Sequence, residues 1–228
     1  MDAFNGIMQS CDVYFYEVAR RTGIDRIAAM ARRFGFGEVL GLDLPGEKPG
    51  LVPSRKWKKK ALNALWQQGE TVLVGIGQGY LLTTPLQLAV MAARLGNGGV
   101  KVTPRLTRPR ADPEPDSFDS IIKGSPDQDP VPESLGLLPA HLDLVRQAMT
   151  GVVNNPQGTA FKARIKTKGQ EMAGKTGTVQ VRRITKAERE EGVRKNKDIP
   201  WRERDHAMFV GFAPIDKPRY AVSVVIEH

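Results

Sequence analysis

The chain has 228 residues, of which 40% are hydrophobic and 26% charged, values that are ordinary for a soluble globular protein of one or two domains. No run of about 20 apolar residues is present, which excludes a membrane-spanning helix within this sequence. The net charge of +9 would suit an anionic partner, but no nucleic-acid motif accompanies it. We therefore expect a solvated basic surface and no nucleic-acid partner.

The first part of the sequence predicts two consecutive helices. Ser10 precedes an apolar pattern that indicates a helix ending near Gly23. From Ile24 to Phe34 apolar residues recur at spacings of three and four, and Gly35 follows as a natural helix terminator. Loop and turn structure is expected next, because the following residues are rich in Gly and Pro.

The middle of the sequence predicts a turn and two further helices. The run 71–74 is apolar and β-branched, and it leads into the glycine-rich segment 75–79. This segment lacks the spacing of a dinucleotide-binding loop, so we interpret it as a turn. Thr84 has N-cap chemistry before a helix expected over 85–96. Another helix is expected over 139–154.

Three strands are predicted at the end of the chain, at about 172–182, 206–213 and 219–227. The last two are separated by Pro-Ile-Asp-Lys-Pro and should pair as a hairpin. The predicted fold class is therefore mixed α/β (α+β), with an antiparallel sheet flanked by helices. Because nothing follows the final strand to cover its apolar side, we expect this sheet to be incomplete in the chain.

The segment from Gly169 to Thr176 fits the P-loop pattern G-x-x-x-x-G-K-[ST]. A P-loop needs an apolar strand before it and a helix directly after it, because the helix N-terminus holds the phosphates. Here the preceding residues are polar and basic, and residues 178–182 alternate like a strand. Nucleotide binding is therefore the less favoured alternative.

Placed on a strand, the same residues suit the binding of a carboxylate. Lys175 would bring a positive charge, and Thr176 and Thr178 would present their hydroxyls on one face. Gly177 would permit close approach of a ligand, and the backbone N–H of Thr178 could contribute to an oxyanion hole. Such a short motif equally suits an exposed turn before a strand.

Upstream, Ser10-Cys11-Asp12 by itself suits a helix N-cap, with the side chain of Ser10 or Asp12 accepting a first-turn N–H. Its significance comes from agreement with other segments. Taken in order, these segments resemble the transpeptidase domain of class B penicillin-binding proteins, closest to the cell-elongation group, penicillin-binding protein 2, of Gram-negative bacteria. The matching segments are residues 10–16, 23–26, 41–47, 75–79, 84–89, 173–178 and 204–214.

The resemblance implies a domain over residues 1–228 from a serine D,D-transpeptidase, which cross-links peptidoglycan stem peptides and is acylated by β-lactams. It implies the D-Ala-D-Ala stem peptide as substrate, and the elongation machinery with a glycosyltransferase as partners. It places the parent protein at the periplasmic face of the inner membrane, held by an N-terminal helix outside this chain. A non-catalytic peptidoglycan- or partner-binding module is the alternative.

Residue by residue, the resemblance implies catalytic roles for Ser10 and Lys175. Ser10 would relay protons to the departing amine, and Lys175 would supply positive charge. The residues implied in substrate binding are Asp12, Thr176, Gly177 and Thr178. Asp12 stands where the wider superfamily often has Asn.

The resemblance also implies a nucleophile in a Ser-x-x-Lys motif N-terminal to Ser10, and no such motif is present there. Ser120 and Lys123 form a literal Ser-x-x-Lys, but they come after Ser10 in a Pro- and Asp-rich excursion, so we reject Ser120 as nucleophile. We expect the nucleophile-bearing part and a C-terminal helix to lie outside this chain, which alone would be inactive.

Cys11 is the only cysteine, which excludes an internal disulfide. It suits a small buried residue next to a helix start. Some elongation-type relatives are thought to bind zinc beside this motif, so a structural zinc ion in the full-length protein is the alternative, with Cys11 as one ligand and the other ligands upstream of this chain. The three histidines have no metal-like spacing to Cys11, and Asp2 is the only nearby acidic candidate. No cofactor is otherwise expected.

Overall fold

The computed structural model describes residues 1–42, 45–106, 133–182 and 184–227. Most of the Pro- and Asp-rich excursion, including Ser120 and Lys123, lies outside the described residues. Among the helices that are described, none combines the length and apolar character needed to cross a membrane.

The described sheet has three antiparallel strands in the order β1-β2-β3: β1 Ala173–Val179, β2 His206–Ala213 and β3 Tyr220–Ile226. All three expected strands and the β2–β3 hairpin are confirmed. β1 ends three residues before the expected limit, and no helix follows it directly. Lys175 therefore lies inside a strand, and the P-loop interpretation is wrong.

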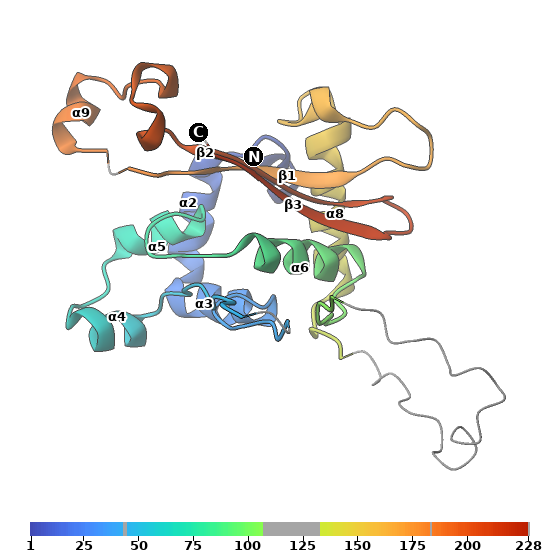
Figure 1. Cartoon of the computed structure of the whole chain (residues 1–228), viewed down its shortest axis with the longest axis horizontal. Helices are drawn as coiled ribbons and strands as arrows, with labels where there is room; N and C mark the ends of the chain where they lie inside the picture. The colour runs from blue at the N-terminus through green and yellow to red at the C-terminus, as the bar shows by residue number, and fades with distance from the viewer. Residues whose placement is uncertain (43–44, 107–132, 183, 228) are drawn as a thin grey trace, which may run out of the picture.

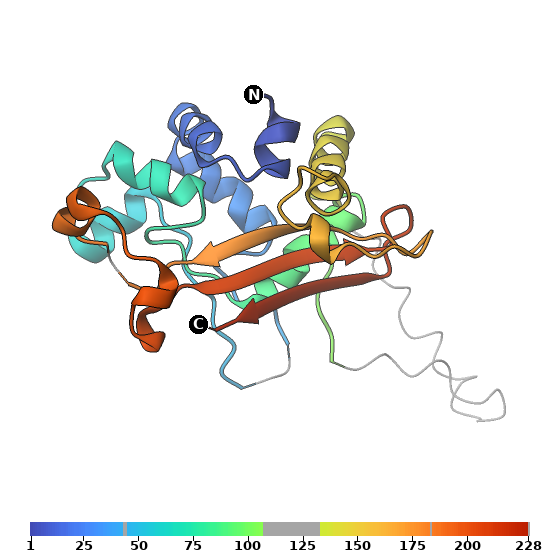
Figure 2. The ribbon, with the colours of Figure 1, turned by 90° about the horizontal axis from the view of Figure 1, so that it is seen from above.

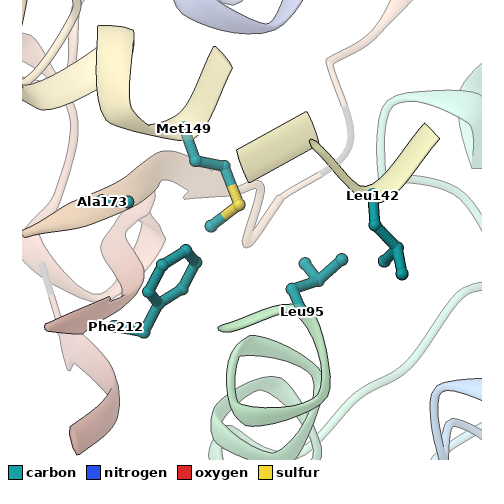
Figure 3. Packing of buried hydrophobic residues seen from close by; sticks show 5 residues of the cluster. All are labelled: Leu95, Leu142, Met149, Ala173 and Phe212. Carbon is teal, nitrogen blue, oxygen red and sulfur yellow. The ribbon is translucent and has the colours of Figure 1, made fainter. Parts of the chain in front are cut away.

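Two helices cover one face of this sheet, as expected for a mixed α/β fold (Figure 1). They are α6 (Pro85–Gly96), which packs on β2 and β3, and α8 (Pro139–Asn154), which packs on β1. Their meeting point with the strands is a buried apolar cluster (Figure 3), made of Leu95, Leu142, Met149, Ala173 and Phe212. This cluster fixes β1 against α8, and so fixes the strand that carries Lys175.

The opposite face of β3 is exposed. Val222, Val224 and Ile226 are 42%, 47% and 63% accessible, whereas the alternate residues face α6. The strand therefore has the period-2 burial of a sheet with one covered face.

The remaining helices stand beside the free edge of β1 and below the sheet (Figures 1 and 2). They are α1 (Ala3–Met8), α2 (Asp12–Thr22), α3 (Ile24–Arg33), α4 (Arg55–Leu62) and α5 (Gln68–Gly75). The second helix predicted from sequence is α3, which ends at Arg33 as expected before Gly35. The sequence did not predict α1, α4 or α5.

The helix α5 contains the β-branched run 71–74. A reciprocal capping box between Gln67 and Glu70 starts this helix, and Thr71 and Val74 are buried on its inner side. Tertiary burial and capping therefore override the weak strand preference of β-branched residues.

The described residues between β1 and β2, 180–182 and 184–205, form a small lobe at one end of the sheet (Figure 1). The lobe contains α9 (Lys186–Glu191) and two short 3-10 helices, Asn196–Asp198 and Trp201–Glu203. Arg182 binds Glu188 through two hydrogen bonds of 2.5 and 2.6 Å. The mixed-sign charges that mark this segment in the sequence therefore include an internal ion pair.

The contact between α2 and α5 depends on a missing side chain at Gly75. A Cβ added there would lie 2.3 Å from the Cβ of Ala19. We expect Gly75→Ala to push the helices apart and to cost about 1–3 kcal/mol of unfolding free energy. Thermal denaturation of the chain measures this loss.

Gly69→Ala is the matched control for Gly75→Ala, because it lies in the same helix and a Cβ there meets nothing within 4 Å. It should be neutral or stabilising by up to about 1 kcal/mol. Equal melting temperatures for the two variants would contradict the prediction.

Candidate functional site

Ser10 lies between α1 and α2 in a backbone conformation that is unusual for serine. α1 ends in a Schellman motif, in which the N–H of Ser10 donates to Ile7 O and that of Cys11 to Gly6 O, at 3.2 and 2.9 Å. Ser10 thus occupies the left-handed position where glycine is usual, with φ of 57°. The helix-cap interpretation is wrong, because Cys11 is the N-cap of α2, which begins at Asp12, and no side chain caps it.

Lys175 reaches Ser10 from β1, across 165 positions of sequence. Its Nζ lies 2.5 Å from Ser10 Oγ and 2.8 Å from the carbonyl oxygen of Thr176. A serine hydroxyl can donate one proton and accept two. Because the Lys175 ammonium only donates, Ser10 Oγ accepts from it, and the hydroxyl proton of Ser10 can be donated to another group inside the pocket.

The backbone of Thr176 and Thr178 faces the free edge of β1. In an antiparallel pair the N–H and C=O of one residue point to the same side, and successive residues alternate. The carbonyls of Thr176 and Thr178 accept from Lys175 and from Gln78 Nε2, the latter at 3.0 Å, so both point away from β2. The N–H of Thr178 therefore also points toward this edge, where the expected oxyanion-binding donor belongs.

A pocket of about 460 Å³ brings together all the residues expected to act on substrate. Its lining residues are Ser10, Asp12, Lys175, Thr176, Gly177 and Thr178, with Phe15, Gly75, Ile76 and Gln78.

The structure also explains why a glycine stands between the two threonines of β1. A Cβ at Gly177 would lie 2.7 Å from Met208 Cγ, so the glycine serves sheet packing.

Sequence reasoning missed several residues of this site. Gln78 lies in the glycine-rich segment 75–79, which was interpreted as a turn and matched the family but was given no role in the site. Phe15 lies in the matching segment 10–16 and was likewise given no role. Thr159, from the segment after α8, holds Thr176 by a 2.8 Å contact between their hydroxyl oxygens. No sequence signal marks Thr159, because only the tertiary fold brings it to β1.

The electrostatics of the pocket centre on Lys175. Burial lowers the pKa of Lys175 below its ordinary value, and the Asp12 carboxylate opposes this by favouring the charged form. Lys175 should therefore lose its positive charge at a lower pH than an exposed lysine. Binding of a carboxylate ligand should weaken over the pH range in which Lys175 loses its charge.

Asp12→Asn tests this coupling. Removing the carboxylate removes the interaction that raises the Lys175 pKa, so the titration midpoint of Lys175 should move to lower pH. NMR of the lysine side chains measures this midpoint, with exposed Lys168 as the internal reference. An unchanged Lys175 midpoint would show that the Asp12 charge does not act on Lys175.

The residues near Cys11 do not fit a zinc site. The carboxylate of Asp2 accepts the N–H of Asn5 as the N-cap of α1. Within the described residues no three His, Cys, Asp or Glu side chains gather as a metal-binding group. Zinc needs about four such ligands, so these residues do not complete a zinc site by themselves.

The family model described as "Penicillin binding protein transpeptidase domain" matches residues 1–228. The chain belongs to this family. Over its whole length it is 37% identical to peptidoglycan D,D-transpeptidase MrdA of Salmonella typhimurium, and over 97% of its length it is 38% identical to that of Acinetobacter baumannii. The chain spans about a third of these relatives, 35% and 31% of their lengths.

Solved penicillin-binding proteins share the fold of this transpeptidase domain. The chain is similar to penicillin-binding protein 2 of Pseudomonas aeruginosa in complex with WCK 5153, with a TM-score of 0.77 and 40% identity, covering 100% of this chain and 44% of that one. It is similar to penicillin-binding protein 2 of Helicobacter pylori in complex with MreC, with a TM-score of 0.79 and 30% identity, covering 100% and 36%. The resemblance to the penicillin-binding protein 2 group is thus confirmed.

Proposed function

We propose that this chain is the part of a peptidoglycan D,D-transpeptidase that carries the proton relay and the carboxylate-binding strand. The observation that carries this proposal is the 2.5 Å hydrogen bond from Lys175 to Ser10 inside one pocket with Thr176 and Thr178. Family membership and the names of the relatives support the same reaction.

The reaction follows from the placement of these groups. The nucleophilic serine of the whole protein attacks the penultimate D-alanine carbonyl of a stem peptide, and its proton passes through the Ser10 hydroxyl to the departing D-alanine nitrogen. The C–N bond breaks and an acyl-ester forms. The amine of a second stem peptide then attacks this ester, and the serine recovers its proton.

Three residues of the strand assist these steps. The Lys175 charge and the hydroxyls of Thr176 and Thr178 would hold the terminal carboxylate of the D-Ala-D-Ala peptide. The N–H of Thr178 would stabilise the negative charge on the attacked carbonyl oxygen. β-Lactams would enter the same pocket, because they present a carboxylate and a reactive carbonyl in a similar relation.

The proposal extends to the setting of the protein. We place it at the periplasmic face of the inner membrane, in the machinery of cell elongation that determines cell shape. A protein related to MreC and a glycosyltransferase are the proposed partners. The complex of the Helicobacter pylori relative with MreC supports the former.

Covalent labelling by a fluorescent penicillin tests the proposal. The full-length protein that contains these residues should be labelled, and excess D-Ala-D-Ala stem peptide should slow the labelling. The 228-residue chain alone should remain unlabelled, since Ser120 begins its only Ser-x-x-Lys. A folded full-length protein that binds peptidoglycan without labelling would favour the non-catalytic binding module.

A further inference from the structure

Gln78 lies at the boundary between two cavities. Its side-chain amide joins the turn after α5 to β1 by donating to the carbonyl of Thr178 at 3.0 Å. The same residue lines the pocket of about 460 Å³ and an adjoining cavity of about 540 Å³. The adjoining cavity is also bounded by Glu70, Tyr80 and Arg182. A shift of this one side chain would change what each cavity can hold.

The backbone that carries Gln78 is held in place. Gly77 and Gly79 have φ of 79° and 76°, a conformation that glycine adopts without strain, and the N–H of Gln78 donates to Leu73 O at 3.0 Å. Tyr80, directly after the turn, packs 5.2 Å from the ring of Trp57. Rotation of the Gln78 side chain would therefore leave the backbone bonds of this turn in place.

The ion pair between Lys58 and Glu70 lies next to Tyr80 at the end of this turn. Lys58 Nζ lies 2.5 Å from a carboxylate oxygen of Glu70 and 6.0 Å from the ring centre of Tyr80. The Lys58 side chain is only 8% accessible, so the pair is shielded from solvent. This buried pair fixes Tyr80 and with it the end of the turn.

The Thr178 carbonyl faces the free strand edge beside Ser10 and Lys175. An extended peptide that aligned with this edge would pair its backbone N–H groups with the edge carbonyls. Both nearby carbonyls already have a side-chain donor, Lys175 for Thr176 and Gln78 for Thr178. A carbonyl oxygen has two lone pairs, so a ligand N–H would either share the Thr178 oxygen with the Gln78 amide or displace that amide, and it gains less from this oxygen while Gln78 stays bound.

We propose that Gln78 is a specificity-determining residue whose amide competes with a ligand amide N–H for the carbonyl of Thr178. This inference rests on the proposed function of the pocket. Ligands with an amide N–H beside the reactive carbonyl weaken or displace the bond from Gln78, and a displaced side chain turns into the adjoining cavity. Ligands without that N–H leave the bond between Gln78 and Thr178 intact. Gln78 therefore reduces the advantage that an N–H bearing ligand would otherwise have.

The test compares two β-lactams on the full-length protein. Benzylpenicillin carries a side-chain amide N–H, and penicillanic acid lacks the whole acylamino group. The measured quantity is the ratio of their second-order acylation rate constants, benzylpenicillin over penicillanic acid. Because Gln78→Ala removes the competing donor, we expect this ratio to rise by about 2- to 10-fold, the worth of one neutral hydrogen bond.

Two more variants sharpen this comparison. Gln78→Glu keeps the size of the side chain but replaces the donor with a carboxylate, so it should raise the ratio as Gln78→Ala does. Gln170→Ala makes the same chemical change at an exposed position before β1 and should leave the ratio unchanged.

Other outcomes would overturn the inference. An unchanged ratio in both Gln78 variants, or an equal fall in both rate constants, would mean that Gln78 only holds the turn. A fall in the ratio would mean that Gln78 helps to bind the ligand amide. Failure of the proposed function is distinguishable, because the unsubstituted protein would then react with neither compound.

Discussion

Replacing Lys175 by Met should lower the second-order rate constant for penicillin acylation of the full-length protein by about 100-fold or more, the usual scale for a lost acid–base contribution. The variant removes both the charge and the donor that lies 2.5 Å from Ser10 Oγ. Ser10 then loses the group that orients its hydroxyl. Time courses of labelling by a fluorescent penicillin measure the rate constant.

A set of companion variants separates chemistry from folding. Lys168→Met removes a lysine that is exposed before β1 and should leave the rate within about threefold. Ser10→Ala should also cost a large factor, and the double variant should cost less than the product of the two single effects, because the two residues share one hydrogen bond while Lys175 also supplies charge to the ligand carboxylate. A rate constant for Lys175→Met within threefold of the unsubstituted protein would refute the assigned role.

Ser10→Gly should give a protein that is more stable than Ser10→Ala and just as inactive. Both variants lose the hydroxyl, but only glycine adopts φ of 57° without strain. The left-handed conformation costs other residues roughly 1–2 kcal/mol, part of which is offset by the greater freedom of glycine in the unfolded chain. We therefore expect a difference of about 1 kcal/mol, or about 2–4 °C in Tm.

A matched position outside the pocket makes this comparison specific. Asn63 has φ of 47° at the C-cap of α4, and its side chain only accepts a hydrogen bond from Lys59. Asn63→Gly should stabilise the protein only slightly, because asparagine tolerates this conformation better than serine and little strain is relieved. Labelling by penicillin should persist in this variant. If Ser10→Gly melts below Ser10→Ala, the backbone strain at Ser10 is not the cause we assign.

The elements that were predictable from sequence are those whose boundaries are marked locally. α6 begins after the Thr84 cap and ends at Gly96, as its capping box and terminal glycines indicate. The three strands follow from period-2 patterns with turn residues between them. In both cases the signals come from neighbouring residues, so they can be read without knowing the fold.

The helices that were missed lack such marks. α5 is rich in β-branched residues, and it is helical because Thr71 and Val74 are buried against neighbouring elements. α1 has only six residues, and it is held by packing against α8. Helices this short depend on tertiary contacts, which a local pattern does not reveal.

The site was predictable only where family motifs mark it. The motif residues Ser10, Asp12 and Lys175 meet in one pocket. Gln78 and Thr159 contact the same strand, but their partners lie 100 and 17 positions away, and neither has a motif that assigns it to the site. The left-handed backbone of Ser10 was equally invisible, because serine usually marks a helix cap.

The hydrogen bond between Ser10 and Lys175 determines when the pocket can form during synthesis and folding. It closes a loop of 165 positions, and the strand that carries Lys175 pairs with residues still further along the chain. During synthesis from the N-terminus, the pocket cannot form until β2 has left the ribosome and paired. Contacts of such long range form slowly, because chain closure must precede any gain from pairing. In the proposed full-length enzyme, acylation by a β-lactam would thus require a completed pocket, and a partly folded protein would not be acylated.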